Sequence, residues 1–197
     1  MPAHEERPQA LPDAVLRELA LQIRKCKWFT TNNLNRDFVG TRGFSIAFHA
    51  TARAQVVAEF PWLLPYLDLA LRPDCNAFYL NPLQLELGSR VDPHIDRSLH
   101  AYCLDIDPPV QVSVLYLDVP AGMIGGELEL RRGRKFLARV RPQPGLFVRF
   151  DGDLMHGVNR VDTKGLRLSL VCEQYALDER ELAQVPEYRI ESRLQRY

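Results

Sequence analysis

Eight short segments in the second half of the chain alternate apolar with polar residues, and no helical pattern separates them. They cover residues 76–81, 83–87, 110–119, 127–131, 135–140, 146–150, 156–161 and 166–175. Such alternation is typical of strands with one buried face, and closely spaced strands favour an antiparallel sandwich or barrel over a βαβ sheet. The sequence therefore predicts a mainly β protein with flanking helices, and the expected architecture is a jelly roll, or double-stranded β-helix.

The first part of the chain has a different texture, because apolar residues recur there at helical spacing. Pro61 interrupts the second helical stretch, and an asparagine-rich polar stretch indicates a loop. The expected elements are a helix at 11–29, a loop at 30–36, a strand at 44–48, and helices at 53–60 and 63–71.

These elements predict one domain over residues 1–197. Helical residues 1–74 are expected to support a jelly-roll core at 75–177. The charged tail, 178–197, carries scattered leucines and is expected to form a solvated helix across the body.

Composition limits the partners that this chain can have. A chain of 197 residues that is 46% hydrophobic can form one sizeable core, and its 25 basic and 25 acidic residues argue against nucleic acid or an anionic membrane. No apolar run approaches the roughly 20 residues of a spanning helix, and the polar start does not resemble a signal peptide, so we expect a cytoplasmic protein. The four cysteines form no C-x-x-C pair, which disfavours a zinc knuckle or a disulfide scaffold. Nothing indicates the oligomeric state.

Three residues could form a metal site. His94 and Asp96 are two residues apart, so an extended backbone projects them to the same side. Each alone has an ordinary explanation, a turn beside Pro93 for this pair and a structural histidine for His156. Together, two imidazoles and a carboxylate on one face of an octahedron suit Fe(II) oxygen chemistry, with zinc as the competing metal.

A second pattern points to a carboxylate ligand. Arg167 and Ser169 alternate with three leucines, so the cation and the hydroxyl share the face opposite the leucines. A guanidinium binds a carboxylate through two parallel hydrogen bonds, and a serine hydroxyl adds a third. An edge-strand arginine exposed to water is the alternative explanation.

These residues occur in an ordered series of motifs. The motifs are His94-x-Asp96, Gly125-Gly126-Glu127-Leu128, Pro144-Gly145 through Phe150 to His156-Gly157-Val158, and Arg167-x-Ser169. The series, spanning about residues 77–175, resembles the Fe(II)/2-oxoglutarate-dependent oxygenases of the prolyl hydroxylase type.

The resemblance implies that His94, Asp96 and His156 are the catalytic iron ligands. It implies that Arg167, with Ser169, binds the far carboxylate of 2-oxoglutarate, and that Fe(II), 2-oxoglutarate and O2 are required, with ascorbate as an optional reductant. Many members have a tyrosine three residues before a glycine upstream of the His-x-Asp pair, where this chain has Leu85. Tyr79 is the candidate replacement, unless no such hydroxyl exists.

The function implied by the resemblance is hydroxylation of an unactivated C–H bond with release of succinate and CO2. A prolyl or other aminoacyl residue of a peptide or protein is the favoured substrate, and a free amino acid or other small metabolite is the alternative. Two further alternatives are a non-catalytic jelly-roll metal-binding or sensing module and a zinc-dependent hydrolase or isomerase.

Two loops bear on the partner. Residues 97–109 leave directly from the His-x-Asp pair and have the length of a substrate cover, with Leu99, Tyr102 and Leu104 as apolar contacts. Residues 131–141 are rich in arginine and lysine, which indicates a charged edge hairpin or a surface for an anionic partner.

Overall fold

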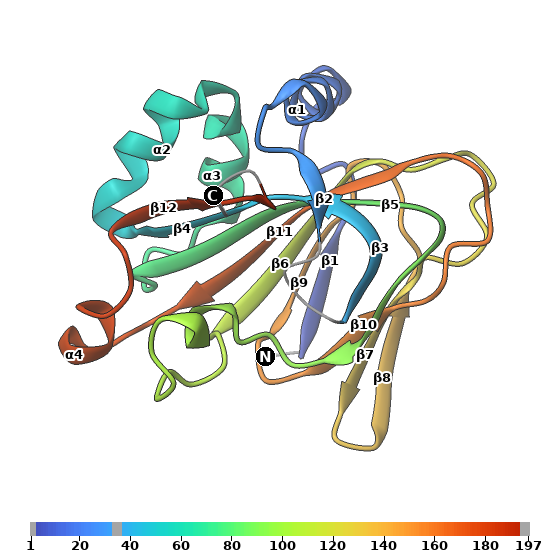
Figure 1. The fold of residues 1–197 in the computed structure, drawn as a ribbon. Helices are drawn as coiled ribbons and strands as arrows, with labels where there is room; N and C mark the ends of the chain where they lie inside the picture. The colour runs from blue at the N-terminus through green and yellow to red at the C-terminus, as the bar shows by residue number, and fades with distance from the viewer. Residues whose placement is uncertain (1–2, 33–36, 194–197) are drawn as a thin grey trace.

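The strands of the computed structural model form one curled sheet, and the helices of the first 70 residues lie on one side of it (Figure 1). The structure describes residues 3–32 and 37–193. Its strands are β1 His4–Arg7, β2 Thr30–Asn32, β3 Phe38–Gly43, β4 Ser45–His49, β5 Ala77–His94, β6 Gln111–Asp118, β7 Leu128–Arg132, β8 Lys135–Val140, β9 Phe147–Asp151, β10 Met155–Val158, β11 Arg167–Tyr175 and β12 Tyr188–Glu191. Its helices are α1 Asp13–Lys25, α2 Arg53–Glu59, α3 Leu64–Ala70 and α4 Glu179–Leu182, with 3-10 turns at Ala50–Ala52, Pro61–Leu63 and Ser98–Ala101.

The strand order is β1-β9-β6-β11-β5-β10-β7-β8, and all these neighbours are antiparallel. β5 is 18 residues long and joins two layers. Its first half pairs with β11 and β4, and its end pairs with β10. The β10-β7-β8 layer lies opposite β11 and β6 across a cavity, which confirms the predicted double-stranded β-helix.

Helices α1, α2 and α3 cover the outer face of the larger layer. Leu16, Leu19 and Ile23 of α1 are buried in a cluster that also contains Leu115 of β6 and Leu170 of β11. Acidic Asp13 in the first turn of α1 and basic residues in its last turn complement the helix dipole. This cluster is the main hydrophobic core and holds the layer that forms the cavity floor.

β5 differs from the two separate strands predicted at 76–81 and 83–87. Pro82 does not break β5, because the strand paired with β5 on one side changes from β4 to β3 at this position. β4 pairs with β5 as far as Leu80, and β3 pairs with it from Leu83 onward. The missing proline N–H therefore falls between the two ladders on that side of β5.

The ends of the chain also depart from expectation. β1 and β2 were not predicted, and β2 lies in the expected loop 30–36, of which residues 33–36 fall outside the described part. The tail forms the single-turn helix α4 and the strand β12, which pairs with β4, and so the helix expected over 178–197 is wrong for the described residues. No helix in the described ranges is long and apolar enough to cross a membrane.

Candidate functional site

His94 and His156 face each other across two paired strands. His94 ends β5, His156 lies in β10, and the strand register places them directly opposite, with ring centroids 4.5 Å apart. Asp96 follows β5 and brings its carboxylate between them: Oδ1 is 3.1 Å from Nε2 of His94, and Oδ2 is 3.3 Å from Nε2 of His156. The structure therefore brings together the three residues that the sequence predicted as metal ligands.

Gly157 allows this close pairing. A Cβ atom at Gly157 would lie 2.9 Å from the carbonyl oxygen of Val91 and 3.2 Å from Cα of Pro93. Any side chain at this position would therefore push β10 away from β5. The glycine after His156 keeps the two strands close enough for both imidazoles to reach Asp96.

Backbone carbonyls orient both rings. Nδ1 of His94 donates to the Asp92 carbonyl at 2.8 Å, and Nδ1 of His156 donates to the Leu154 carbonyl at 3.0 Å. A carbonyl only accepts, so Nδ1 carries the proton in each neutral ring and Nε2 presents a lone pair. In that tautomer two nitrogen lone pairs and a carboxylate converge, an arrangement that suits a metal ion.

In the absence of a metal ion, the groups of the site attract protons. Burial tends to raise the pKa of Asp96, but the charges of and hydrogen bonds from His156 and His94 hold that pKa well below its ordinary value. Burial tends to lower the pKa of His94, and the hydrogen bond and charge of Asp96 raise it to about 9. Oδ2 of Asp96 is buried and faces Nε2 of His156 at 3.3 Å. The donor set fits a divalent cation that accepts nitrogen and oxygen ligands.

His94, Asp96 and His156, the candidate ligands, line a cavity between the two layers. Its walls are mainly apolar and come from both layers, including Val114 of β6, Leu128 of β7 and Phe150 of β9. Its polar groups are few, which makes their positions informative.

Arg167 and Ser169, the predicted carboxylate-binding pair, both line this cavity. The side chain of Arg167 is only 2% exposed, and its Nε and Nη1 have no hydrogen-bond partner among the residues that the structure describes. A buried guanidinium without an anionic partner is costly. The hydroxyl of Ser169 makes only a long bond of 3.4 Å to the Leu83 carbonyl. Both side chains remain available to an anion in the cavity.

Tyr116 was not predicted. This β6 residue is fully buried, its ring lies 4.8 Å from the guanidinium carbon of Arg167, and no described group bonds its hydroxyl. The sequence signal for Tyr116 was its alternation with Val112 and Val114, which places the three side chains on one face of β6. Residues 112–117 are buried on both faces, so hydrophobic alternation did not distinguish the cavity face from the helix face.

Tyr79 lies elsewhere. Its hydroxyl donates to Glu191 of β12 at 2.8 Å, and its ring packs against the cluster containing Ala47 and Leu99. It is not among the residues that line the cavity. The structure thus separates Tyr79 from Arg167 and Ser169, and Tyr116 occupies the position beside the guanidinium.

The segment 97–109 is attached to the body. Leu99 is fully buried, whereas Leu104 is 81% exposed. Glu173 of β11 accepts hydrogen bonds from the backbone N–H and the hydroxyl of Ser98, and Glu191 accepts one from Tyr102. The interpretation of Leu99 as a substrate contact is therefore wrong, because Leu99 belongs to the core.

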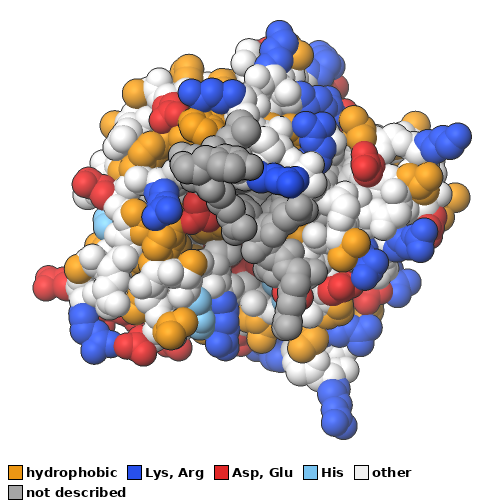
Figure 2. Space-filling model, in the orientation of Figure 1, with side chains coloured by type: hydrophobic (Ala, Val, Ile, Leu, Met, Phe, Trp, Pro, Cys, Tyr) orange, Lys and Arg blue, Asp and Glu red, His pale blue; other side chains and the backbone are white. Residues whose placement is uncertain are grey.

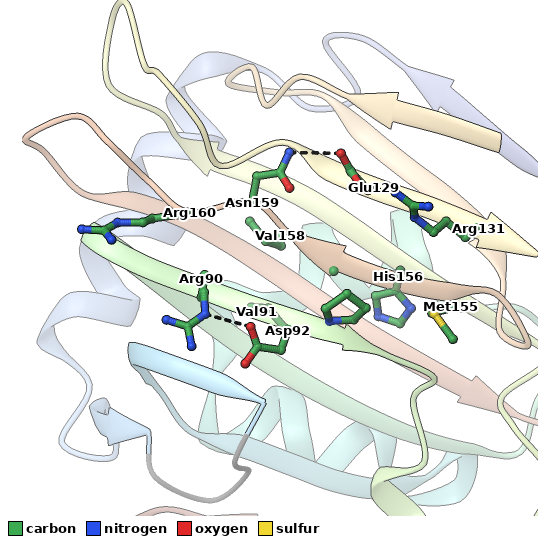
Figure 3. Close-up of a pocket in the computed structure, with 12 residues that line it drawn as sticks. Arg90, Val91, Asp92, Glu129, Arg131, Met155, His156, Val158, Asn159 and Arg160 are labelled. Atoms are coloured by element: carbon green, nitrogen blue, oxygen red, sulfur yellow. Dashed lines mark hydrogen bonds and ion pairs between the residues drawn. The ribbon is translucent and has the colours of Figure 1, made fainter. Parts of the chain in front are cut away.

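A second hollow lies on the outer face of the smaller layer, behind His156 (Figure 3). Its charged side chains are mostly paired with one another. Arg90 donates to Asp92 at 2.8 Å, and Arg131 donates to Glu129 at 3.2 Å. With its charges paired, this hollow differs from the internal cavity, where Arg167 has no partner.

The structure thus combines a double-stranded β-helix with two histidines and an aspartate at a cavity that an arginine also lines. No protein-family model matches the sequence, and no curated protein is similar to it in sequence. Solved structures do match in fold. A prolyl-4-hydroxylase from Pseudomonas putida is 20% identical with a TM-score of 0.63, covering 90% of this chain and 95% of that one.

Two further structures have the same fold. A prolyl hydroxylase from Trichoplax adhaerens, in complex with a hypoxia inducible factor oxygen degradation domain peptide fragment, is 15% identical with a TM-score of 0.60 and covers 92% and 86% of the two chains. HygX from Streptomyces hygroscopicus, with nickel and 2-oxoglutarate bound, is 15% identical with a TM-score of 0.54 and covers 89% and 84%. The fold expected from the motifs is therefore the fold of 2-oxoglutarate oxygenases.

Proposed function

We propose that this protein is an Fe(II)- and 2-oxoglutarate-dependent dioxygenase that hydroxylates an unactivated C–H bond. One observation carries the proposal: the guanidinium of Arg167 is buried without an anion in a cavity that His94, Asp96 and His156 also line. A molecule with a carboxylate at one end and a metal-chelating group at the other could bind both groups. 2-Oxoglutarate has this form.

The residues of the chain have separate roles. His94, Asp96 and His156 would hold the iron through two imidazole nitrogens and one carboxylate oxygen, a ligand set that suits Fe(II) oxygen chemistry. Arg167 and Ser169 bind the distal carboxylate, and the Tyr116 hydroxyl beside the guanidinium adds a third donor. When bound, Fe(II) supplies the redox centre at which O2 is reduced while 2-oxoglutarate loses CO2.

The two oxygen atoms of O2 enter different products in this reaction. One oxygen atom of O2 enters succinate and the other enters the hydroxylated product. The apolar cavity walls, including Val114 and Phe150, exclude water from the reacting groups. Exclusion of water favours oxidation of the bound substrate over loss of oxidising equivalents to solvent.

The favoured substrate is a prolyl or other aminoacyl residue of a polypeptide. Support comes from the fold, which is shared with prolyl hydroxylases, one of them solved with a peptide fragment. The neutral overall charge agrees with a peptide more than with a nucleic acid. Cytoplasmic location remains an expectation.

Anaerobic titration and turnover together test the proposal. Fe(II) with 2-oxoglutarate should give a weak visible charge-transfer band, and air should then produce succinate. A screen of proline-containing peptides, free amino acids and small metabolites should identify a substrate that gains one oxygen atom. The Asp96→Ala variant should lose the band and the turnover. Tight zinc binding without any effect of 2-oxoglutarate would instead indicate a hydrolase or a sensing module.

A further inference from the structure

The β7–β8 hairpin concentrates positive charge in a chain with no net charge. Residues 127–141 contain six basic and two acidic residues, a net charge of +4. The hairpin projects from the smaller layer, and Lys and Arg side chains occupy the protrusion at the bottom of the space-filling view (Figures 1 and 2). We call this surface, Arg131, Arg134, Lys135, Phe136 and Arg139, the basic hairpin surface.

Ion pairing does not neutralise the surface. Arg131 and Arg139 share the single carboxylate of Glu129. Arg134 and Lys135 at the tip are exposed and make no ion pair or side-chain hydrogen bond within residues 3–32 and 37–193. By contrast, the cations that line the neighbouring hollow have acidic partners, as Arg90 has in Asp92 (Figure 3). The hairpin is thus the part of this face with unsatisfied positive charge.

An exposed aromatic ring lies among these cations. The Phe136 side chain is 47% exposed, and the guanidinium carbons of Arg131 and Arg139 lie 5.6 Å and 6.0 Å from its ring centre. A register shift between Leu130 and Arg131 pairs Phe136 with Arg131 and Arg139 with Glu129, which brings residues three apart onto one face. The irregularity therefore builds an apolar contact flanked by two positive charges.

β8 also has a free edge. It is the last strand of the sheet and pairs only with β7 in the described chain. Its outer N–H and C=O groups can pair with another extended segment. A second copy would bring the same positive charges against this edge, and like charges oppose that pairing. An acidic segment would instead be attracted to these positive charges.

We propose that the free edge of β8 and the basic hairpin surface bind an extended, acidic segment of a polypeptide by strand addition. The backbone of the segment pairs with β8, an apolar side chain contacts Phe136, and its acidic side chains face the cations. The strand pairing β8-β7-β10 places this edge two strands from His156, a distance of about 10 Å at usual strand spacing. That this segment belongs to the substrate rests on the proposed function, whereas the binding itself does not.

A peptide of four Glu-Val repeats, labelled with a fluorophore, is the probe. Its binding to the metal-free protein is followed by fluorescence anisotropy, so that the outcome is independent of turnover. We expect saturable binding that weakens as salt is raised from about 0.05 M to 0.5 M, because ions screen exposed charges. A Lys-Val peptide of equal length should not bind.

Two changes separate charge from strand pairing. The double variant Arg134→Glu/Lys135→Glu should bind the probe about tenfold more weakly or worse. A matched reversal of exposed cations outside the hairpin, Arg17→Glu/Lys164→Glu, should leave binding unchanged. A probe with alternate backbone nitrogens methylated keeps its charge but cannot pair with an edge strand, and should lose binding.

Each contrary result overturns the proposal. Equal binding of the methylated probe would exclude strand addition, and unchanged binding by Arg134→Glu/Lys135→Glu would exclude the surface. Tighter binding of an eight-residue oligothymidine than of the acidic peptide would assign the hairpin to nucleic acid. Circular dichroism and 2-oxoglutarate turnover without substrate should match wild type in both double variants, which excludes misfolding as the cause.

Discussion

Arg167 should lower the stability of the ligand-free protein, although we propose that it binds 2-oxoglutarate. Its guanidinium is 2% exposed and lacks hydrogen-bond partners at Nε and Nη1 in the described structure, so burying its charge costs several kcal/mol. Its contact with the Tyr116 ring at 4.8 Å returns only about 1–2 kcal/mol. Replacement by methionine keeps most of the volume and removes the charge. We therefore expect Arg167→Met to raise the free energy of unfolding of the ligand-free protein by about 1–3 kcal/mol.

The same substitution should weaken 2-oxoglutarate binding. A charge-assisted contact of this kind contributes about 2–4 kcal/mol, or about 30-fold to 1000-fold in affinity. Ser169→Ala should cost less, about 1 kcal/mol. Calorimetric titration of 2-oxoglutarate into the Mn(II) protein measures affinity, and denaturant unfolding of the metal-free protein measures stability.

Arg149 provides a matched control. It also lies in the larger layer with its guanidinium carbon 5.0 Å from an aromatic ring, that of Phe147. Arg149 is only partly buried, and although its Nε also lacks a partner in the described residues, its Nη2 donates to the Leu69 carbonyl at 3.0 Å. Arg149→Met should lower the free energy of unfolding by about 1 kcal/mol and leave 2-oxoglutarate affinity unchanged. If Arg167→Met lost stability as Arg149→Met does while retaining normal affinity, the cavity would not be the carboxylate site.

Three further results are expected. His156→Ala should abolish Fe(II) binding and turnover in a folded protein, and normal activity of this variant would disprove the triad. Tyr116→Phe should lower 2-oxoglutarate affinity by about 1 kcal/mol, whereas Tyr79→Phe should leave it unchanged, because the Tyr79 hydroxyl donates to Glu191 outside the cavity; the reverse order in titration would restore Tyr79 as the ligand. Burial, and then the charge of Asp96, raises the pKa of Glu173 from 4.5 to about 8. Between these pH values the folded protein holds a proton that the unfolded chain has lost, so the free energy of unfolding should fall as pH rises. Glu173→Gln should flatten this dependence in denaturant titrations, and parallel curves for the two proteins would contradict the assignment.

Much of the site could be predicted because its residues are chemically unusual for their context. Two histidines in strands, an aspartate two residues after one of them, and an arginine alternating with leucines suggest ligands by residue type and spacing alone. Tyr79 and Tyr116 could not be told apart in this way. A tyrosine hydroxyl can bind the cosubstrate only if it faces the cavity. The residues next to Tyr79 and Tyr116 in sequence are buried, so the burial pattern does not show which way either side chain faces.

The segment 97–109 shows the same limit. Its length and its position after the His-x-Asp pair are typical of a mobile cover, and the sequence contains no local mark of what holds it. The structure attaches it through Glu173 and Glu191, which lie far along the chain. Contacts between distant residues depend on the complete topology and leave no periodic pattern in either segment.

The class of fold and the choice of candidate metal ligands follow from local pattern and residue chemistry. Alternation has a period of two in any strand, and imidazole and carboxylate groups have the same chemistry in any fold. The folded arrangement was needed to show that His156 opposes His94, that Tyr116 rather than Tyr79 accompanies Arg167, and that the described part of the tail contains a strand. Those outcomes depend on register and on which side of a twisted sheet each residue faces. Both are set by the packing of all strands together, so no single segment encodes them.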